Sequence, residues 1–223
     1  MAFRIEVVPF LLVALALCGI LAILLRVVRV SWRKSLVYSV FVLLVLCLYL
    51  LYFFRDPVRT PPADSAAIVA GAEGKVMGVV DVDDPVYLKG RAVRISIFLS
   101  LIDVHVNRAP ISGRVESAAY FRGARHFTFQ EKSSDLNQHS AILIHGEAVD
   151  CLVKQIVGPV ARRVVYWLEP GQMLQRGDRI GMMKFGSRLD MYLPVDKVDV
   201  LVKKGDKVRA GETVVARLKA AKE

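Results

Sequence analysis

GQMLQRGDRI, at Gly171–Ile180, returns as GDKVRAGETV at Gly205–Val214. Both segments have glycine at the first and seventh positions, an acid at the eighth, and an apolar residue at the fourth and tenth. Glycine permits the backbone angles of tight corners, and the apolar positions suit a strand that faces a core. Each segment therefore predicts a turn–strand–turn unit, and the pair indicates a β domain rich in hairpins.

The sequence before these units supports the same fold class. From Ala66 onward, short runs rich in Val and Ile alternate with glycines, as in Val93–Leu99 and Ala141–Ile144. This pattern predicts a mainly β fold. The repeated units are similar to those that build the barrel-sandwich fold of lipoyl and biotinyl carrier domains, and Pro110–Val115 resembles another of them. We therefore expect a barrel-sandwich-like domain over residues 66–223.

The amino end has a different character. Pro9–Leu25 and Leu36–Phe54 contain no charged residue, and each has about the length of a membrane-spanning helix, roughly 17–25 residues. No small-residue cleavage site follows the first run, which argues against a removable signal peptide. We expect a helical hairpin over residues 1–54, transmembrane or membrane-embedded, that anchors the chain. The proline-rich residues 55–65 then form an extended linker.

The orientation of this hairpin stays open. A basic connector (Arg26, Arg29, Arg33 and Lys34) separates the two apolar runs, and the positive-inside rule places such a connector in the cytoplasm. Two complete spans would then put the β domain outside. A hairpin that enters the membrane without crossing it would leave both the connector and the β domain inside.

Composition excludes several classes of function. The net charge is +10, but there is no long basic run and no recognition motif, so nucleic acid is not an expected partner. The basic surplus suits either anionic lipid headgroups or ordinary solvated surface. Cys151 is the only cysteine after the hairpin, which excludes an internal disulfide there and fits a reducing compartment. The four histidines are scattered, so no metal site is expected.

Gly186-Ser187 is the only Gly-Ser pair in the chain. A serine hydroxyl beside a glycine carbonyl can attack its own backbone, because glycine has no Cβ in the way. Such an attack would convert the Gly186–Ser187 amide into an ester and allow the chain to be cut there. The alternative interpretation is a tight turn between two strands.

Three blocks favour the first interpretation: FFRDP at Phe53–Pro57, SLIDVHVNRAPISG at Ser100–Gly113 and GMMKFGSR at Gly181–Arg188. Together and in this order they resemble the short, membrane-anchored bacterial phosphatidylserine decarboxylases. The resemblance implies self-cleavage between Gly186 and Ser187 into a large chain, 1–186, and a small chain, 187–223. It also implies that Ser187 becomes a covalent pyruvoyl group, which serves as the cofactor.

The resemblance further implies the reaction. The pyruvoyl ketone forms a Schiff base with the amine of phosphatidylserine and accepts the electrons left by departing carbon dioxide, so that phosphatidylethanolamine is the product. The implied location is the bacterial inner membrane, with the catalytic domain on the cytoplasmic face. A homodimer is left open.

Particular residues acquire roles from the resemblance. His105, in the Asp-Val-His block, is the expected proton carrier for decarboxylation, and its imidazole suits that task. Arg108 stands where longer members have a second histidine, and Glu73 stands where the family has an aspartate. The base for self-cleavage is therefore open between Glu73, His105 and His139. Arg108 stays protonated and could either stabilise an oxyanion or bind phosphate. Asn107 and Arg188 are candidates for substrate binding, and the alternative for Arg188 is a structural role at a strand end.

Two other functions remain open at this point. A membrane-tethered adaptor or carrier of the lipoyl or biotinyl type, without catalysis, would explain the glycine units and the hairpin. A carrier needs an exposed lysine between its hairpins, and Lys184, the nearest candidate, is not at such a tip. A pyruvoyl decarboxylase that acts on a related amino-lipid would share every motif above.

Overall fold

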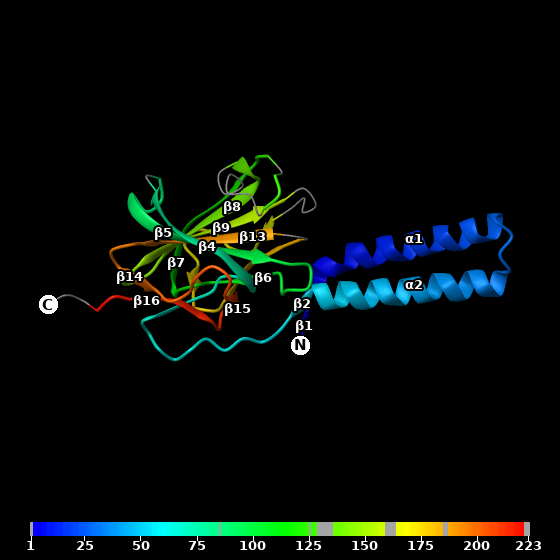
Figure 1. The fold of residues 1–223 in the computed structure, drawn as a ribbon, viewed down its shortest axis with the longest axis horizontal. Coiled ribbons are helices and arrows are strands. Elements are labelled where there is room, and N and C mark those ends of the chain that lie inside the picture. The colour runs from blue at the N-terminus through cyan, green and yellow to red at the C-terminus, as the bar shows by residue number, and fades with distance from the viewer. Residues whose placement is uncertain are drawn as a thin grey trace. The chain divides into compact units, whose positions relative to one another are not determined.

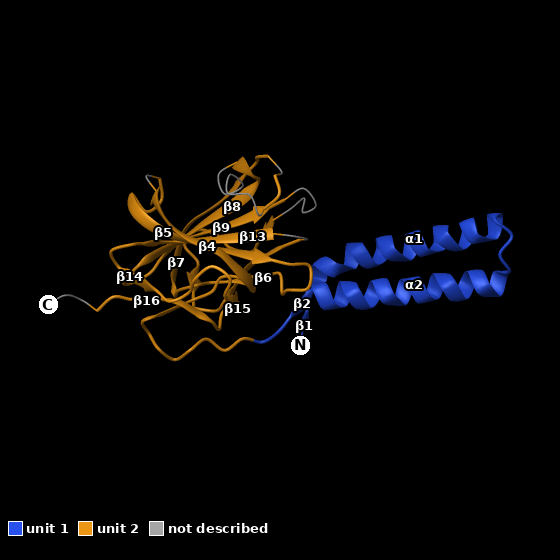
Figure 2. Ribbon diagram, viewed as in Figure 1, with its two compact units in different colours: residues 1–58 blue, residues 59–223 orange. Residues whose placement is uncertain are grey.

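The computed structural model describes residues 2–84, 86–124, 126–128, 136–158, 164–184 and 187–220. The chain divides into two compact units, residues 1–58 and residues 59–223 (Figure 2). The first unit contains both apolar segments, and the second contains the strands rich in Val and Ile.

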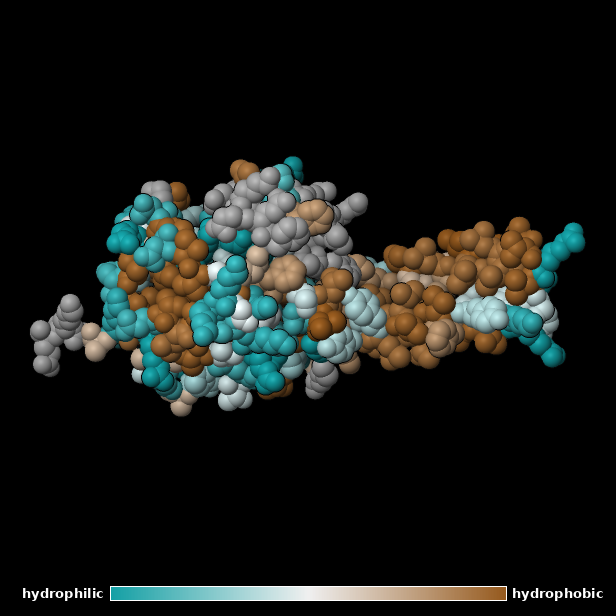
Figure 3. Space-filling model, viewed as in Figure 1, coloured by the Kyte–Doolittle hydropathy of each residue, from teal (hydrophilic) through white to brown (hydrophobic). Residues whose placement is uncertain are grey.

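The first unit is a helical hairpin of α1 (Val8–Val27) and α2 (Trp32–Phe53), preceded by the 3-10 turn η1 (Ile5–Val7) (Figure 1). Large apolar side chains cover its outer surface, and those of Leu12, Ile23 and Phe41 are all more than 60% exposed (Figure 3). A helix of a water-soluble protein would bury such residues on one face. Both helices are long and apolar enough to span a membrane, and their exposed apolar surfaces suit association with one.

Polar contacts join the two arms of this hairpin. The Ser35 hydroxyl donates a hydrogen bond of 2.8 Å to the carbonyl of Ala22 on the other helix. At the open end, β1 (Ala2–Phe3) pairs with β2 (Arg55–Asp56). These contacts satisfy polar groups that hydrocarbon could not solvate.

The second unit is built on one antiparallel sheet of eight strands (Figure 1). In spatial order the strands are β11 (Met173–Leu174), β7 (Gly113–Phe121), β8 (His139–His145), β9 (Asp150–Val157), β13 (Ser187–Pro194), β5 (Gly90–Leu99), β4 (Gly74–Asp84) and β15 (Lys207–Val208). Side chains alternate between the two faces of a strand. On β13, Leu189 and Met191 therefore face the main core, and Arg188 and Asp190 face the opposite side, which we call the outer face.

Two smaller sheets complete the domain. One contains β10 (Val164–Tyr166), β12 (Arg179–Met183) and β6 (Val106–Arg108), and the other β14 (Val198–Val200), β16 (Val214–Leu218) and β3 (Ala67–Val69). Their buried side chains, such as Ile180 and Val215, belong to the same core as Leu189 of the large sheet. Three sheets around one core confirm the predicted mainly β, sandwich-like domain that follows a helical hairpin.

The glycine units of the sequence lie at the two edges of the large sheet, since β11 and β15 are its first and last strands. The four glycines have φ between 76° and 103°, a region that side chains with a Cβ rarely adopt. The hydrogen bonds repeat as well: the amide of Gly171 donates to Val115, and that of Gly205 donates to Val76. The predicted turn–strand–turn units are therefore confirmed, and they are related by an internal repeat.

The same repeat extends to the first residues of β4 and β7, where a glycine lies against a neighbouring strand. A Cβ on Gly74 would lie 2.0 Å from the carbonyl oxygen of Phe98, and one on Gly113 would lie 2.3 Å from that of His145. Only glycine fits at either position, and Gly74 also has a φ of 151°. Because Glu73 directly precedes Gly74, this close contact between strands constrains the backbone from which the Glu73 side chain extends.

Candidate active site

Ser187 opens β13 in the middle of the large sheet. It pairs with Leu99 at the end of β5 and with Val157 at the end of β9. The residue is fully buried, and its hydroxyl has no hydrogen-bond partner within the described part of the chain. A buried hydroxyl without a partner costs about 1–3 kcal/mol, so its presence here calls for a functional reason. Gly186, the predicted cleavage partner, lies outside the described residues.

Two chain crossings bring the His105 segment to Ser187. The chain leaves the large sheet after Leu99 and enters the small sheet at Val106, and it returns from Met183 of that sheet to Ser187. The amide of Met183 donates a 3.2 Å hydrogen bond to the carbonyl of His105. The segment that contains His105 and the segment that leads into Ser187 therefore run between the same two sheets.

The imidazole of His105 has a defined tautomer. Its Nδ1 lies 2.9 Å from the carbonyl oxygen of Asp103. A carbonyl can only accept a hydrogen bond, so Nδ1 carries the proton and Nε2 is the basic nitrogen. The carboxylate of Asp103 accepts from both the amide (2.8 Å) and the hydroxyl (2.5 Å) of Ser100, which holds the turn in shape. The side chain of His105 is fully buried, so the imidazole is shielded from bulk solvent.

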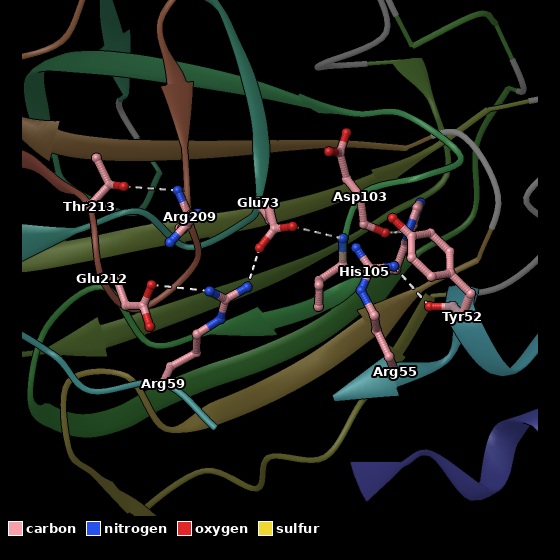
Figure 4. Close-up of polar contacts among 10 residues, drawn as sticks. Tyr52, Arg55, Arg59, Glu73, Asp103, His105, Arg209, Glu212 and Thr213 are labelled. Carbon is pink, nitrogen blue, oxygen red and sulfur yellow. Dashed lines mark hydrogen bonds and ion pairs between the residues drawn. The ribbon is translucent and has the colours of Figure 1, made fainter. Parts of the chain in front are cut away.

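The carboxylate of Glu73 contacts the backbone of the segment that contains His105 (Figure 4). One carboxylate oxygen accepts a long hydrogen bond of 3.4 Å from the amide of Val104, the residue before His105. The other forms an ion pair with Arg59, whose guanidinium also binds Glu212 at 3.0 Å. The carboxylate of Glu73 is thus held beside the backbone that carries His105.

Asn107, two residues after His105, belongs to a buried network of side-chain hydrogen bonds. The Oδ1 atom of Asn107 accepts a 2.7 Å hydrogen bond from Gln155, and Gln155 accepts one of 2.7 Å from the hydroxyl of Ser140. The Nδ2 group of Asn107 is buried and has no acceptor within the described residues. It can therefore donate to a ligand. Gly181 makes room for this network, because a Cβ there would lie 2.8 Å from Nε2 of Gln155.

The two arginines predicted from the sequence are both buried and both engaged. Arg108 donates a 2.8 Å hydrogen bond to the carbonyl of Gly177, at a corner of the first glycine unit. Arg188 forms a 2.7 Å ion pair with Asp190 and donates a 2.8 Å hydrogen bond to the hydroxyl of Ser96. Because Arg188 follows Ser187 on β13, its side chain lies on the outer face of the sheet.

Among the described residues, neither the cysteine of the β domain nor a cluster of metal-binding side chains offers a competing site. Burial, with a smaller effect of Asp150, raises the pKa of the Cys151 thiol, so this cysteine is not a nucleophile. The described residues contain no group of three or more His, Cys, Asp or Glu side chains that could hold a metal ion.

Comparison with known proteins identifies the family. The sequence matches phosphatidylserine decarboxylase over residues 46–216. The chain belongs to the phosphatidylserine decarboxylase family. A relative from Carboxydothermus hydrogenoformans is 43% identical over 208 residues, which cover 93% of each chain. A relative from Salinibacter ruber is 49% identical over 173 residues, which cover 76% of each chain. A relative from Pelobacter propionicus is also 49% identical, over 177 residues that cover 78% of this chain and 79% of the relative. All three are named phosphatidylserine decarboxylase proenzyme, a term for a chain that is processed to its active form.

The residues predicted to take part in the decarboxylase reaction are not all close together in the structure. Ser187, His105 and Glu73 lie on segments that the structure brings together, and Asn107 is next to them on β6. His139 starts β8, where its ring stacks on that of Phe121 at 5.0 Å and its Nδ1 contacts the carbonyl of Asn137 at 2.7 Å. These contacts give His139 a structural role in the sheet.

Two residues of the site could not be predicted from the sequence. Arg59 lies in the proline-rich linker, where a charge suggests only exposure to water, yet it binds Glu73. Gln155 lies on a strand otherwise rich in apolar residues, yet it orients the amide of Asn107. A polar residue inside an apolar strand was the one signal that pointed to Gln155.

Proposed function

We propose that this chain is a self-processing, pyruvoyl-dependent phosphatidylserine decarboxylase that produces phosphatidylethanolamine and carbon dioxide. The observation that carries the proposal is the Ser187 hydroxyl, which is fully buried and has no partner in the described part of the chain. A hydroxyl that starts a strand, follows a glycine and lies by a buried histidine segment suits attack on its own backbone. Family membership supplies the reaction class.

In this proposal the Ser187 hydroxyl attacks the carbonyl of Gly186 and converts the amide to an ester. Removal of the α-proton of Ser187 then releases Gly186 as the carboxylate end of chain 1–186. The remaining dehydroalanine gives the pyruvoyl group by tautomerisation and hydrolysis, with loss of ammonia. No atom outside the chain and water is consumed.

The residues present fit the pyruvoyl group, which has the carbon skeleton of Ser187 and needs no further cavity. Once formed, it supplies an electron sink for the charge left by departing carbon dioxide. The small chain 187–223 stays in place after cleavage, since β13 pairs with β5 and β9, and β15 and β16 pair with β4 and β3. All four of these partner strands belong to the large chain.

We assign proton transfer during decarboxylation to Nε2 of His105. Its tautomer leaves that nitrogen able to take up and return a proton, and burial keeps competing water away. We assign activation of the attacking group to the Glu73 carboxylate, and hydrogen bonding of the substrate to Nδ2 of Asn107. Arg108 is assigned to oxyanion stabilisation during cleavage, and Arg188 to binding of the substrate phosphate.

The proposed location is the cytoplasmic face of a bacterial inner membrane. Two helices of sufficient length and hydropathy support anchorage, and a buried, unpaired cysteine supports a reducing compartment.

The experiment that tests this function supplies defined lipids to the purified full chain in mixed micelles. We expect phosphatidylserine to yield phosphatidylethanolamine and carbon dioxide in equal amounts. A matched arm offers phosphatidylthreonine, which has one extra methyl on the headgroup. Turnover of the threonine lipid alone would assign the enzyme to a related amino-lipid, and release of no carbon dioxide from either would favour the non-catalytic carrier.

We predict that Glu73→Gln slows self-cleavage by about 10²–10⁴, because glutamine keeps the hydrogen-bonding shape but loses the basic site and the ion pair with Arg59. The measurement is a time course of chain cleavage after synthesis in a cell-free system. Arg108→Ala provides a comparison, since loss of one oxyanion donor slows the same step by about 10²–10³. A wild-type rate in Glu73→Gln would exclude the carboxylate and leave His105 as the base.

A further inference from the structure

A cavity of about 450 Å³ lies on the outer face of the large sheet. Its polar lining consists of Lys75, Arg94, Ser96, Arg188 and Lys204, and none of the described residues that line it is acidic. Four cationic side chains from separate parts of the chain therefore face one space. We call it the cationic cavity.

Cross-strand register places this cavity at the same end of the sheet as Ser187. Lys75 on β4, Phe98 on β5 and Arg188 on β13 are paired neighbours, so they form one row across three strands. The next row along these strands is Ser187 with Leu99. Side chains alternate along a strand, so those of Ser187 and Leu99 point to the core face, and the cavity lies on the other face at the same end of the sheet.

The charges of the cavity favour an anion. Like charges that converge in a partly enclosed space raise one another's energy, and a bound anion relieves that repulsion. The carboxylate of Asp190 offsets the charge of Arg188 and, with Ser96, fixes the guanidinium in one orientation. Lys75 and Lys204 are exposed, so their ammonium groups can close on a ligand.

The remaining lining is apolar. Met77 and Phe98 are partly buried and Val80 is exposed, and all three contribute hydrocarbon surface beside the cations. A ligand with a charged group and an attached hydrocarbon portion matches this combination better than a small inorganic anion, which would leave the apolar wall unused.

We propose that the cationic cavity binds the phosphodiester of an anionic phospholipid and that the headgroup reaches residue 187 around the end of the sheet at which β13 begins. The inference rests on the proposed decarboxylase function and adds to Arg188 the residues Lys75, Arg94, Ser96 and Lys204. Decarboxylation removes one negative charge from the headgroup, so the same cations bind the substrate more tightly than the product. The cavity thereby assists release of phosphatidylethanolamine.

The first test measures kinetics with the full chain in mixed micelles. Lys75→Gln with Lys204→Gln should raise the apparent KM for phosphatidylserine by about tenfold or more, with kcat and chain cleavage nearly unchanged. Lys203→Gln is the matched control, because Lys203 is exposed and adjacent to Lys204 but does not line the cavity. A wild-type KM in the double variant would overturn the proposal.

The second test needs no catalysis. The Ser187→Ala chain is placed in phosphatidylcholine nanodiscs with and without phosphatidylserine. It is then briefly acetylated, and the extent of acetylation at each lysine is measured by mass spectrometry. We expect phosphatidylserine to protect Lys75 and Lys204 and not Lys203, even if no lipid is ever decarboxylated. Equal protection by inorganic phosphate in phosphatidylcholine nanodiscs would overturn the lipid assignment, and absence of protection would overturn the site.

Discussion

Ser187→Ala is expected to remain a single chain of 24.8 kDa and to release no carbon dioxide from phosphatidylserine. The substitution removes the only atom that we propose as the nucleophile, so neither cleavage nor the pyruvoyl group can follow. The hydroxyl has no hydrogen-bond partner in the described part of the chain, and alanine has nearly the same shape. Removing an unsatisfied buried hydroxyl is neutral or stabilising, so thermal unfolding should stay at or above the wild-type temperature.

Denaturing gels and intact mass give the readout for Ser187→Ala, and Ser117→Ala on β7 is the matched control in the same sheet. The control should cleave and turn over normally. Cleavage of Ser187→Ala into the same two chains would show that another residue cuts the backbone.

His105→Ala is expected to lower turnover per cleaved chain by about 10²–10⁴, the range of general acid–base catalysis. The imidazole is fully buried and its Nε2 is the basic nitrogen, so no water replaces it readily. The measurement divides the rate of carbon dioxide release by the amount of small chain, which separates turnover from processing. Normal turnover per cleaved chain would remove His105 from the reaction.

His145→Ala is the control for this variant. The imidazole of His145 is 61% exposed and pairs with Asp150 at the surface, away from the catalytic segments. It should retain wild-type cleavage and turnover. An equal loss in both variants would indicate a general effect of histidine removal rather than a catalytic role.

Much of the fold could be predicted because it follows from local patterns. The glycine units require positive φ at fixed spacing, and the structure has such angles at Gly171, Gly177, Gly205 and Gly211. The uncharged runs predict α1 and α2 by length alone. The position of the units at opposite edges of one sheet was beyond the sequence, because strand order depends on pairings between distant segments.

The site was predicted less completely, for the same physical reason. Ser187 and His105 could be named from their motifs, but the hydrogen bond that joins Met183 to His105 depends on the chain crossing twice between the sheets. The ion pair of Arg59 with Glu73 joins a linker residue to a turn, and no periodicity connects them. Arg188 could be named, yet its burial on the outer face beside Asp190 followed only from the register of β13.

The most direct test of the account is the mass and amino terminus of the small chain from active, full-length protein. We predict a chain that begins at residue 187, resists amino-terminal sequencing and is lighter than the serine-ended chain 187–223 by one ammonia. Active protein that is a single uncut chain, or a small chain that retains a serine amine, would contradict the proposed origin of the cofactor.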